Sequence, residues 1–480
     1  MKTTNALIYN ALLFSLAVSC SNEKKSPKPN ILFIAVDDLR PELGCYDHPV
    51  VQSPNLDQLA SEGAMFTRAY CNIPVCGASR ASLMTGSRPT RNRFLHYYTR
   101  IDLERDTVPT VYEHFKNNGY YTISNGKVVH HSQTDAIEGW DEIWMAKSLG
   151  GWRDYVVPEN IEMNKSQRGV PYEMANVPDT AYRDGKIAAK AISDLRKLKD
   201  MDQPFFLACG FLKPHLPFNA PKKYWDLYSK EDIKLPDNNY KPEGAPDAAM
   251  HNWGELRSYY GIPKEGSLTD EMAKTLIHGY YACVSYTDAQ IGKILAELEN
   301  LGLRENTVVI VWGDHGWNLR EHGLWCKHCN FNTSLNAPII VSAPGKKQDV
   351  KVDAITEFVD IYPTLCDLAG LEKPTHLEGA SFAHLLDNPD AESDGIAVCK
   401  WFDGVTIIKD NYFYTEWTDD NDSIYTRMLY DHANDPDENV NISEKQENQQ
   451  LVDELSNLIR EHRGEDFFKE VNAVYSQSDK

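Results

Sequence analysis

The sequence is short of several features that mark other classes of protein. It contains no internal repeat and no low-complexity tract, which argues against solenoids and coiled coils. Only 10 of its 480 residues are cysteine, too few for a disulfide scaffold. Basic residues are also scarce: 49 lysines and arginines face 70 acidic residues, and the formal net charge is −21. A nucleic-acid partner is therefore not expected, and any site for an anion must be locally basic or hold a metal ion.

Long apolar runs are equally scarce, and the most informative one lies in residues 1–20. Lys2 precedes an apolar stretch at residues 6–18, which is typical of an export signal and short for a membrane span. Cys20 lies where a lipoprotein signal carries its acylated cysteine, and the polar residues 21–29 would form a tether. We predict export to the periplasm or cell surface, with a lipid anchor at Cys20 as the contact with the membrane. A cleaved secretory signal with an incidental cysteine is the alternative.

Short apolar runs alternate with helical patterns over most of the chain. Ser53-Pro54 opens one helix, as N-cap and first position, and a long helical pattern over residues 270–301 ends at Gly302. This alternation predicts an α/β fold with a large, mostly parallel central sheet and helices on both faces. In such sheets ligands bind at the carboxyl ends of the strands. The predicted strands are residues 30–36, 121–124, 205–209, 308–312 and 339–341.

The pattern changes after about residue 390. Residues 407–417 are typical of a β-hairpin, residues 419–441 are acidic and rich in turn formers, and residues 449–462 have helical periodicity. The sequence therefore predicts a catalytic domain over residues 30–390 and a smaller α+β C-terminal subdomain over residues 391–480.

Carboxylates follow two of the predicted strands. Asp37-Asp38 come directly after residues 30–36, and Asp314-His315 come after residues 308–312. Each pair alone is better explained by a solvated turn or a helix cap. Adjacent carboxylates repel one another unless a cation lies between them. Three carboxylates and one imidazole at matching strand ends predict a calcium or magnesium site rather than a zinc site.

Two cysteine motifs stand out. Residues 326–329 have the CxxC spacing of zinc sites, but without a second such pair they favour a buried thiol pair or one local disulfide. The other motif, residues 76–80, reads Cys-Gly-Ala-Ser-Arg and precedes Thr85-Gly86. It resembles the signature of the sulfatase family, C-x-P/A-x-R with a downstream T-G, in which the cysteine is oxidised to formylglycine. Cys71 lacks the pattern, because Val75 stands where arginine is required.

The resemblance to sulfatases, and among them to the iduronate-2-sulfatase branch, extends over residues 30–371. It implies an alkaline-phosphatase-like α/β sandwich and a sulfuric ester hydrolase. The further motifs follow the family order: Val36-Asp37-Asp38-Leu39-Arg40-Pro41, Gly126-Lys127-Val128-Val129-His130, Lys213-Pro214-His215-Leu216-Pro217-Phe218, Gly313-Asp314-His315-Gly316-Trp317, and Glu321-His322-Gly323 through Trp325 and Lys327.

The same resemblance implies the role of each site residue. A maturation enzyme would convert Cys76 to formylglycine (3-oxoalanine), and a hydroxyl of its hydrate would attack sulfur. Arg80 would orient that hydrate, and His130, favoured over His131 by the family spacing, would assist release of sulfate or protonate the leaving alcohol. The ligands of one calcium ion would be Asp37, Asp38, Asp314, His315 and an oxygen of modified Cys76; the sulfate would be held by Lys127, His215 and Lys327. Hydrolysis of a sulfate ester independently requires fixed positive charge and a proton donor.

The substrate is the least constrained part of the prediction. An exported enzyme of this type is expected to act on a sulfated oligo- or polysaccharide, such as ulvan or glycosaminoglycan fragments. The basic and aromatic residues 88–105 would line the pocket and contact acidic sugar groups, unless they form a solvated loop. Two alternatives remain: a phosphodiesterase or phosphonate hydrolase of the same superfamily, and a catalytically silent lipoprotein that binds sulfated glycans. The complete motif set favours the sulfatase.

Overall fold

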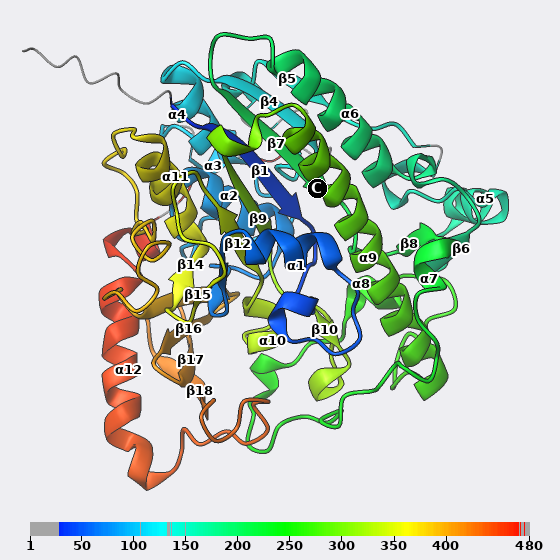
Figure 1. The fold of residues 1–480 in the computed structure, drawn as a ribbon. Helices are drawn as coiled ribbons and strands as arrows, with labels where there is room; N and C mark the ends of the chain where they lie inside the picture. The colour runs from blue at the N-terminus through cyan, green and yellow to red at the C-terminus, as the bar shows by residue number, and fades with distance from the viewer. Residues whose placement is uncertain are drawn as a thin grey trace, which may run out of the picture.

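A computed structural model describes residues 28–105, 107–131, 135, 137–148, 150–469, 471 and 475. The export signal and Cys20 lie outside these residues and stay predictions. The centre of the fold is an eight-stranded sheet with strand order β13-β2-β12-β9-β1-β7-β4-β5 (Figure 1). Its strands are β1 (Asn30–Val36), β2 (Ala64–Phe66), β4 (Tyr121–Gly126), β5 (Glu142–Trp144), β7 (Phe205–Phe211), β9 (Thr307–Gly313), β12 (Ile339–Ser342) and β13 (Val350–Val352).

The central strands are continuous apolar runs because both faces of the sheet are covered. Every residue of β1, β7 and β9 is buried. All strands of this sheet except β12 run in one direction, which confirms the mostly parallel prediction. Val36 pairs with Phe211 of β7 and with Gly313 of β9, so these three strands end at the same level. Residues that follow them are therefore delivered to one edge of the sheet.

Helices cover both faces of the sheet (Figure 1). On one face lie α1 (Pro54–Ser61), α6 (Arg183–Leu198) and α9 (Asp270–Asn300); on the other lie α2 (Cys76–Thr85), α4 (Val111–Asn117) and α11 (Ile361–Ala369). The remaining elements are β3 (Ala69–Tyr70), β6 (Tyr172–Ala175), β8 (Phe218–Pro221), β10 (Asn318–Leu319), β11 (Trp325–Cys326), β14 (Thr356–Glu357), α3 (Ile101–Glu104), α5 (Pro158–Ser166), α7 (Lys222–Trp225), α8 (Gly254–Arg257) and α10 (Asn332–Leu335).

The helix ends follow the sequence signals only in part. Helix α9 ends within one residue of the predicted position, and Gly302, which follows the C-cap Leu301, lies in the left-handed region at φ 68°. The predicted start of α1 is confirmed, with Ser53 at the N-cap position and Pro54 as the first helical residue, but the Ser53 side chain makes no capping hydrogen bond. Instead, the carboxylate of Asp288 on α9 accepts hydrogen bonds from the backbone N–H groups of Asn55 and Leu56. The start of α1 is thus capped by a residue distant in sequence.

The C-terminal region forms a four-stranded antiparallel sheet, β15 (Ile396–Trp401), β16 (Gly404–Lys409), β17 (Tyr412–Thr418) and β18 (Ile424–Asp431), with helix α12 (Gln449–His462). It has a hydrophobic cluster of its own between the sheet and α12. The predicted hairpin corresponds to β16 and β17, and α12 has the predicted bounds. Residues 419–441, expected to be turns, contain the strand β18, whose first half is largely exposed and gave no apolar alternation. The domain boundary at residue 390 stays a prediction.

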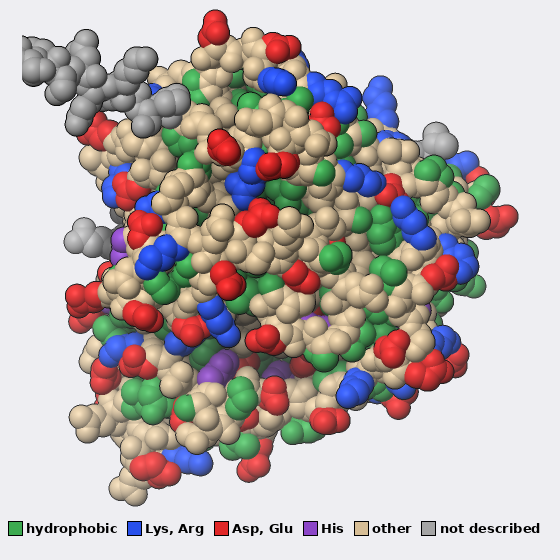
Figure 2. Space-filling model, in the orientation of Figure 1, with side chains coloured by type: hydrophobic (Ala, Val, Ile, Leu, Met, Phe, Trp, Pro, Cys, Tyr) green, Lys and Arg blue, Asp and Glu red, His purple; other side chains and the backbone are tan. Residues whose placement is uncertain are grey.

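One face of the molecule shows how charge is distributed on its surface. Acidic and basic side chains are intermixed on the face that carries α1, α6 and α9 (Figure 2). Within the described ranges, no helix combines the length and the apolar character needed to cross a membrane. The positive charge that an anionic substrate needs must therefore be concentrated locally.

Candidate active site

Charged residues converge at the carboxyl ends of four adjacent parallel strands. Asp37 follows β1, Asp314 follows β9, Lys127 follows β4, and His215 lies just beyond β7. The shared level of the strand ends brings these side chains to one edge, as the sequence predicts. Cys76 reaches the same place as the first residue of α2. The predicted site residues thus meet although they are far apart in the sequence.

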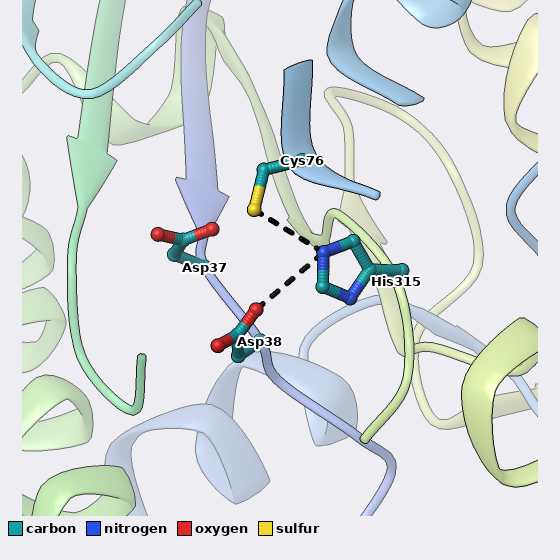
Figure 3. A group of neighbouring side chains, drawn as sticks. All are labelled: Asp37, Asp38, Cys76 and His315. Atoms are coloured by element: carbon teal, nitrogen blue, oxygen red, sulfur yellow. Dashed lines mark hydrogen bonds and ion pairs between the residues drawn. The ribbon is translucent and has the colours of Figure 1, made fainter. Parts of the chain in front are cut away.

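Four of the five predicted metal ligands form a compact group (Figure 3). Ligand atoms of Asp37, Asp38, Cys76 and His315 all lie within 4.8 Å of one another. His315 Nε2 lies 3.5 Å from Cys76 Sγ and 3.4 Å from Asp38 Oδ1. The other ring nitrogen, Nδ1, donates a hydrogen bond to the carbonyl of Gly316 at 2.9 Å. This bond fixes the imidazole so that Nε2 faces the group, as in many metal-binding histidines.

The backbone conformation of Asp38 allows two consecutive carboxylates to point into the same space. Successive side chains of an extended strand point to opposite sides. Asp38, directly behind β1, has a φ of 59°, in the left-handed region that few non-glycine residues occupy. This turn breaks the alternation, so that Asp37 and Asp38 both point toward His315 and Cys76 (Figure 3). An unfavourable backbone conformation at a site of clustered charge is a common mark of function.

Asp314, the fifth predicted ligand, lies beside this group rather than within it. Its Oδ1 accepts a hydrogen bond from the backbone N–H of Asp38 at 2.9 Å and lies 3.6 Å from His315 Nε2. Its Oδ2 accepts from Nε of Arg80 at 2.9 Å. Asp314 therefore buttresses the loop that carries Asp38, and its place among the metal ligands stays a prediction.

Arg80 is fully buried and ties three strand ends together. Besides Asp314, its guanidinium lies 3.5 Å from Asp37 and donates to the carbonyls of Lys127 and Val128. Helix α2 places it one turn beyond Cys76. These contacts engage its donors with protein groups, so its direct contact with a hydrate at residue 76 stays a prediction.

Two lysines bring positive charge to the carboxylates. Lys127 Nζ lies 2.5 Å from Asp37 Oδ2, and Lys327 Nζ lies 3.0 Å from Asp38 Oδ1 and 4.8 Å from the centre of the Trp317 ring. Burial alone would lower the pKa of each lysine, but the neighbouring carboxylates outweigh burial and raise it. Both side chains are therefore fixed ammonium groups, suited to an anion.

The two predicted histidines differ in their surroundings. His215 donates from Nδ1 to the carbonyl of Leu216 at 2.5 Å, and burial lowers its pKa to about 3. Burial, and after it the charge of Lys127, lowers the pKa of His130. Nδ1 of His130 is buried and has no hydrogen-bond partner in the described part of the chain. Its ring contacts that of Tyr97, with centroids 5.9 Å apart.

Cys76 is only 3% exposed. Burial, and after it the charge of Asp37, raises the pKa of its thiol to about 12. Since the thiolate rather than the thiol is nucleophilic, an unmodified Cys76 is poorly suited to attack in this arrangement. Cys71, which lacks the motif, is also buried and contacts the carbonyl of Ser334 instead of the acidic group.

The CxxC motif at residues 326–329 forms no disulfide. The thiols of Cys326 and Cys329 are buried and free, so the buried thiol pair is confirmed over a disulfide.

Within residues 88–105, Arg88 pairs with Glu357, Arg91 with Asp420 and Arg100 with Asp102. These arginines already pair with acids of the chain, and their contact with acidic sugar groups stays a prediction. The part of this segment that reaches the site is the Tyr97 ring beside His130.

Glu255, on the short helix α8, is a site residue that sequence reasoning missed. Its Oε2 lies 3.0 Å from Lys327 Nζ and its Oε1 lies 3.3 Å from His215 Nε2. Burial would raise its pKa, but Lys327 and then His215 hold that pKa well below the usual range. With Asp38 and His215 it forms a second set of close potential ligands. No strand or motif marks it, since its position depends on the path of the loop before α9.

We expect Glu255→Gln to lower kcat/KM for nitrophenyl sulfate by about 10- to 100-fold, because small misplacements of anion-binding groups have effects of this size. The substitution keeps the side-chain volume and removes the charge that anchors Lys327 and His215. Steady-state kinetics together with the melting temperature check it. Glu299→Gln, an exposed position on α9, is the matched control. Equal kinetics of both variants would show that Glu255 has no part in the site.

A buried cysteine amid carboxylates, lysines and histidines at the sheet edge defines the class of protein. A model of the family described as Sulfatase matches residues 29–371, and one described as N-sulphoglucosamine sulphohydrolase, C-terminal, matches residues 320–465. The chain belongs to the sulfatase family and is a sulfuric ester hydrolase, as its motifs predict.

Individual relatives support the same assignment. Iduronate 2-sulfatase of Mus musculus is 32% identical over 416 residues, which cover 78% of this chain and 75% of that protein. A sulfatase of Formosa agariphila is 31% identical over 458 residues, covering 90% and 88%. An ulvan-active sulfatase of the same organism is 29% identical over 509 residues, covering 98% and 91%. The predicted resemblance to iduronate-2-sulfatases and bacterial sulfatases is confirmed.

Solved structures with low sequence identity show the fold. A phosphonate monoester hydrolase from Silicibacter pomeroyi matches with a TM-score of 0.76 at 21% identity, covering 91% of this chain and 95% of that one. A 2-O GAG sulfatase matches with a TM-score of 0.70 at 23% identity, covering 93% and 95%. The alkaline-phosphatase-like sandwich with its antiparallel C-terminal sheet is thereby confirmed.

Proposed function

We propose that this sulfatase removes sulfate from a sulfated oligo- or polysaccharide, using a formylglycine made from Cys76 and one calcium ion. The observation that carries the proposal is the position of residue 76, at the start of α2 and within 4.8 Å of ligand atoms of Asp37, Asp38 and His315. Relatives named as an ulvan-active sulfatase and a 2-O GAG sulfatase support the substrate class.

The donor set fits a hard divalent cation. Asp37 and Asp38, with Asp314 beside them, offer the carboxylate oxygens that calcium prefers, and His315 adds one oriented nitrogen. The sulfur of Cys76 is the poorest donor for calcium, whereas an oxygen in its place completes an oxygen-rich set. A bound calcium ion supplies positive charge that stabilises the anionic groups of the reaction.

The remaining residues act on the sulfate and on protons. A formylglycine supplies an aldehyde whose hydrate carries the attacking hydroxyl. Lys127 and Lys327 hold fixed ammonium groups that neutralise charge on the sulfuryl oxygens. His215, whose Nδ1 donates to a backbone carbonyl, would help to hold the sulfate, and His130 would exchange a proton with residue 76 or with the leaving alcohol.

Burial of Cys76 also bears on its maturation. A side chain that is 3% exposed at the start of a wholly buried helix is inaccessible to another enzyme in the folded chain. The formylglycine-generating enzyme must therefore act before α2 packs against the sheet. We propose this enzyme as an obligatory partner, acting on the unfolded segment around residues 76–80.

A comparison of sulfate and phosphate substrates tests the proposed activity. We expect the matured enzyme to hydrolyse nitrophenyl sulfate with a higher kcat/KM than bis-nitrophenyl phosphate, because the pocket offers two lysines and a histidine to a terminal sulfuryl group. The fold shared with phosphonate monoester hydrolases motivates the comparison. A preference for the phosphate diester would favour that activity, and no turnover of either ester by matured protein would favour a glycan-binding protein.

A further inference from the structure

Two arginines near the site have no acidic partner. Within the described part of the chain, no carboxylate lies within ion-pair distance of Arg153 or Arg168. Their side chains donate hydrogen bonds to neutral groups instead, Arg153 to Asn164 and Arg168 to Ser258. In a chain with 70 acidic residues against 49 basic ones, two neighbouring arginines without an acid are unexpected. A guanidinium group without an acidic partner is well suited to bind an anionic ligand.

Both arginines face the phenol of Tyr259. The Arg168 guanidinium lies over the Tyr259 ring, 5.6 Å from its centre. Burial lowers the pKa of Arg153; the nearby phenol of Tyr259 acts against this, and the positive charge of Arg168 adds to it. Like charges held together without an anion between them are unfavourable, and binding an anion relieves the repulsion.

Unsatisfied polar atoms lie at the same place. Nε of Arg153, Oη of Tyr259 and Oδ1 of Asn219 are buried and have no hydrogen-bond partner in the part of the chain that is described. Asn219 is a neighbour of Arg153 in space, because its Nδ2 donates to the backbone carbonyl of Arg153 at 2.9 Å. Buried polar atoms in folded proteins nearly always have partners. The polar atoms of this cluster are therefore suited to bind a polar group of a ligand.

Trp152 connects this cluster with the sulfate grip. Its indole is 46% exposed, the Arg153 guanidinium lies 4.2 Å above it, and the His215 ring meets it edge-on at 5.9 Å. Together these two distances place the guanidinium carbon at most about 10 Å from the His215 ring. One or two sugar rings cover such a span. An exposed indole between two polar sites also offers an apolar face to a sugar ring.

We propose that Arg153 and Arg168 form a second anion subsite that binds another acidic group of the same saccharide. Trp152, which lies between this subsite and His215, would contact the sugar ring. The inference rests on the proposed function, because it names the kind of substrate that the sulfate site accepts. Guanidinium groups bind carboxylates and sulfates through paired hydrogen bonds. The substrate is therefore a polyanionic saccharide with a second acid close to the reacting sulfate, either a uronate carboxylate or a second sulfate. The arginines also offset locally the repulsion from a chain of net charge −21.

Matched disaccharides test the subsite. The probes are a monosulfated disaccharide with a uronic acid, its carboxyl-reduced counterpart, and a disulfated disaccharide without a carboxylate. For the wild type we expect KM to be about tenfold lower, or more, for the better acidic disaccharide than for the carboxyl-reduced one, since a charge-assisted hydrogen bond has an effect of this size. Arg153→Gln and Arg168→Gln should each bring this ratio close to one, and Arg153→Lys should retain part of it.

Arg196→Gln removes a positive charge from the exposed surface of α6 and should keep the wild-type ratio. A larger loss with the uronic acid identifies the carboxylate as the ligand, and a larger loss with the disulfated sugar identifies sulfate. Equal wild-type KM values for all three sugars would overturn the subsite. An unchanged KM ratio in both glutamine variants, at the wild-type melting temperature, would do the same and leave a cluster that binds water only.

Nitrophenyl sulfate separates this inference from the proposed function. It carries no second acid, so its turnover by matured wild-type enzyme reports the sulfatase chemistry alone. If it is not hydrolysed, the proposed function fails, and calorimetry with the uronic-acid disaccharide tests the subsite directly. Binding to the wild type that weakens about tenfold in Arg153→Gln supports it, and equal binding contradicts it.

Discussion

Cys76→Ala is expected to reduce turnover of nitrophenyl sulfate by roughly 10³-fold or more, the loss typical of a removed nucleophile. Cys76 is the first residue of α2 and lies 3.5 Å from His315 Nε2, so alanine removes the attacking group without a change in the surrounding charges. Initial rates of purified, matured protein measure the loss.

Cys71→Ala is the matched control for this substitution. Cys71 is buried, like Cys76, but contacts the backbone carbonyl of Ser334 and has no arginine four residues downstream. We expect it to retain most activity. Comparable losses in the two variants would point to packing rather than chemistry. Substantial activity of Cys76→Ala would exclude residue 76 as the nucleophile.

Asp38→Asn is expected to lower activity by about 10²-fold or more and to weaken calcium binding, because it removes a charged oxygen ligand while keeping the size of the side chain. It also removes the ion pair with Lys327 at 3.0 Å. Calorimetric titration of chelated protein with calcium, followed by activity assays, measures both effects. Asp226→Asn, on the exposed surface beyond α7, is the control. Full activity of the wild type after exhaustive chelation would contradict the role of the cation.

Asp314 is a less informative position for the same test. Its carboxylate accepts from the fully buried Arg80 and from the backbone of Asp38. Its removal leaves a buried guanidinium without its partner, which typically destabilises a protein by about 3–5 kcal/mol. A loss of activity in Asp314→Ala would therefore combine unfolding with loss of a ligand, whereas Asp38→Asn keeps this buttress.

The sequence predicts the centre of the fold because its signals there are local. Buried parallel strands are continuous apolar runs, so β1, β4, β7 and β9 are found within a residue or two of their observed ends. The run at residues 339–341 also forms a strand, but antiparallel, since an apolar run has the same composition in either direction. Strands of three residues, such as β2, are too short to show a pattern.

In the candidate site, too, some residues could be placed from the sequence and others could not. The acids behind β1 and β9 could be placed together, because parallel strands deliver their carboxyl ends to one edge. Glu255, Arg153 and Arg168 could not, since they enter through irregular segments whose path is set by tertiary contacts. The cap of α1 by Asp288 was missed for the same reason. Sequence thus predicted which acids meet at the edge of the sheet better than it predicted the residues around them.

Peptide mass analysis of residue 76 in catalytically active protein tests the central claim most directly. Protein produced with a formylglycine-generating enzyme should yield a peptide in which oxygen replaces sulfur at this residue, with loss of two hydrogens. The modified fraction should rise in proportion to the specific activity across preparations with different degrees of conversion. Fully active protein that carries an unmodified thiol at Cys76 would contradict the formylglycine mechanism, and the sulfatase would then require another nucleophile.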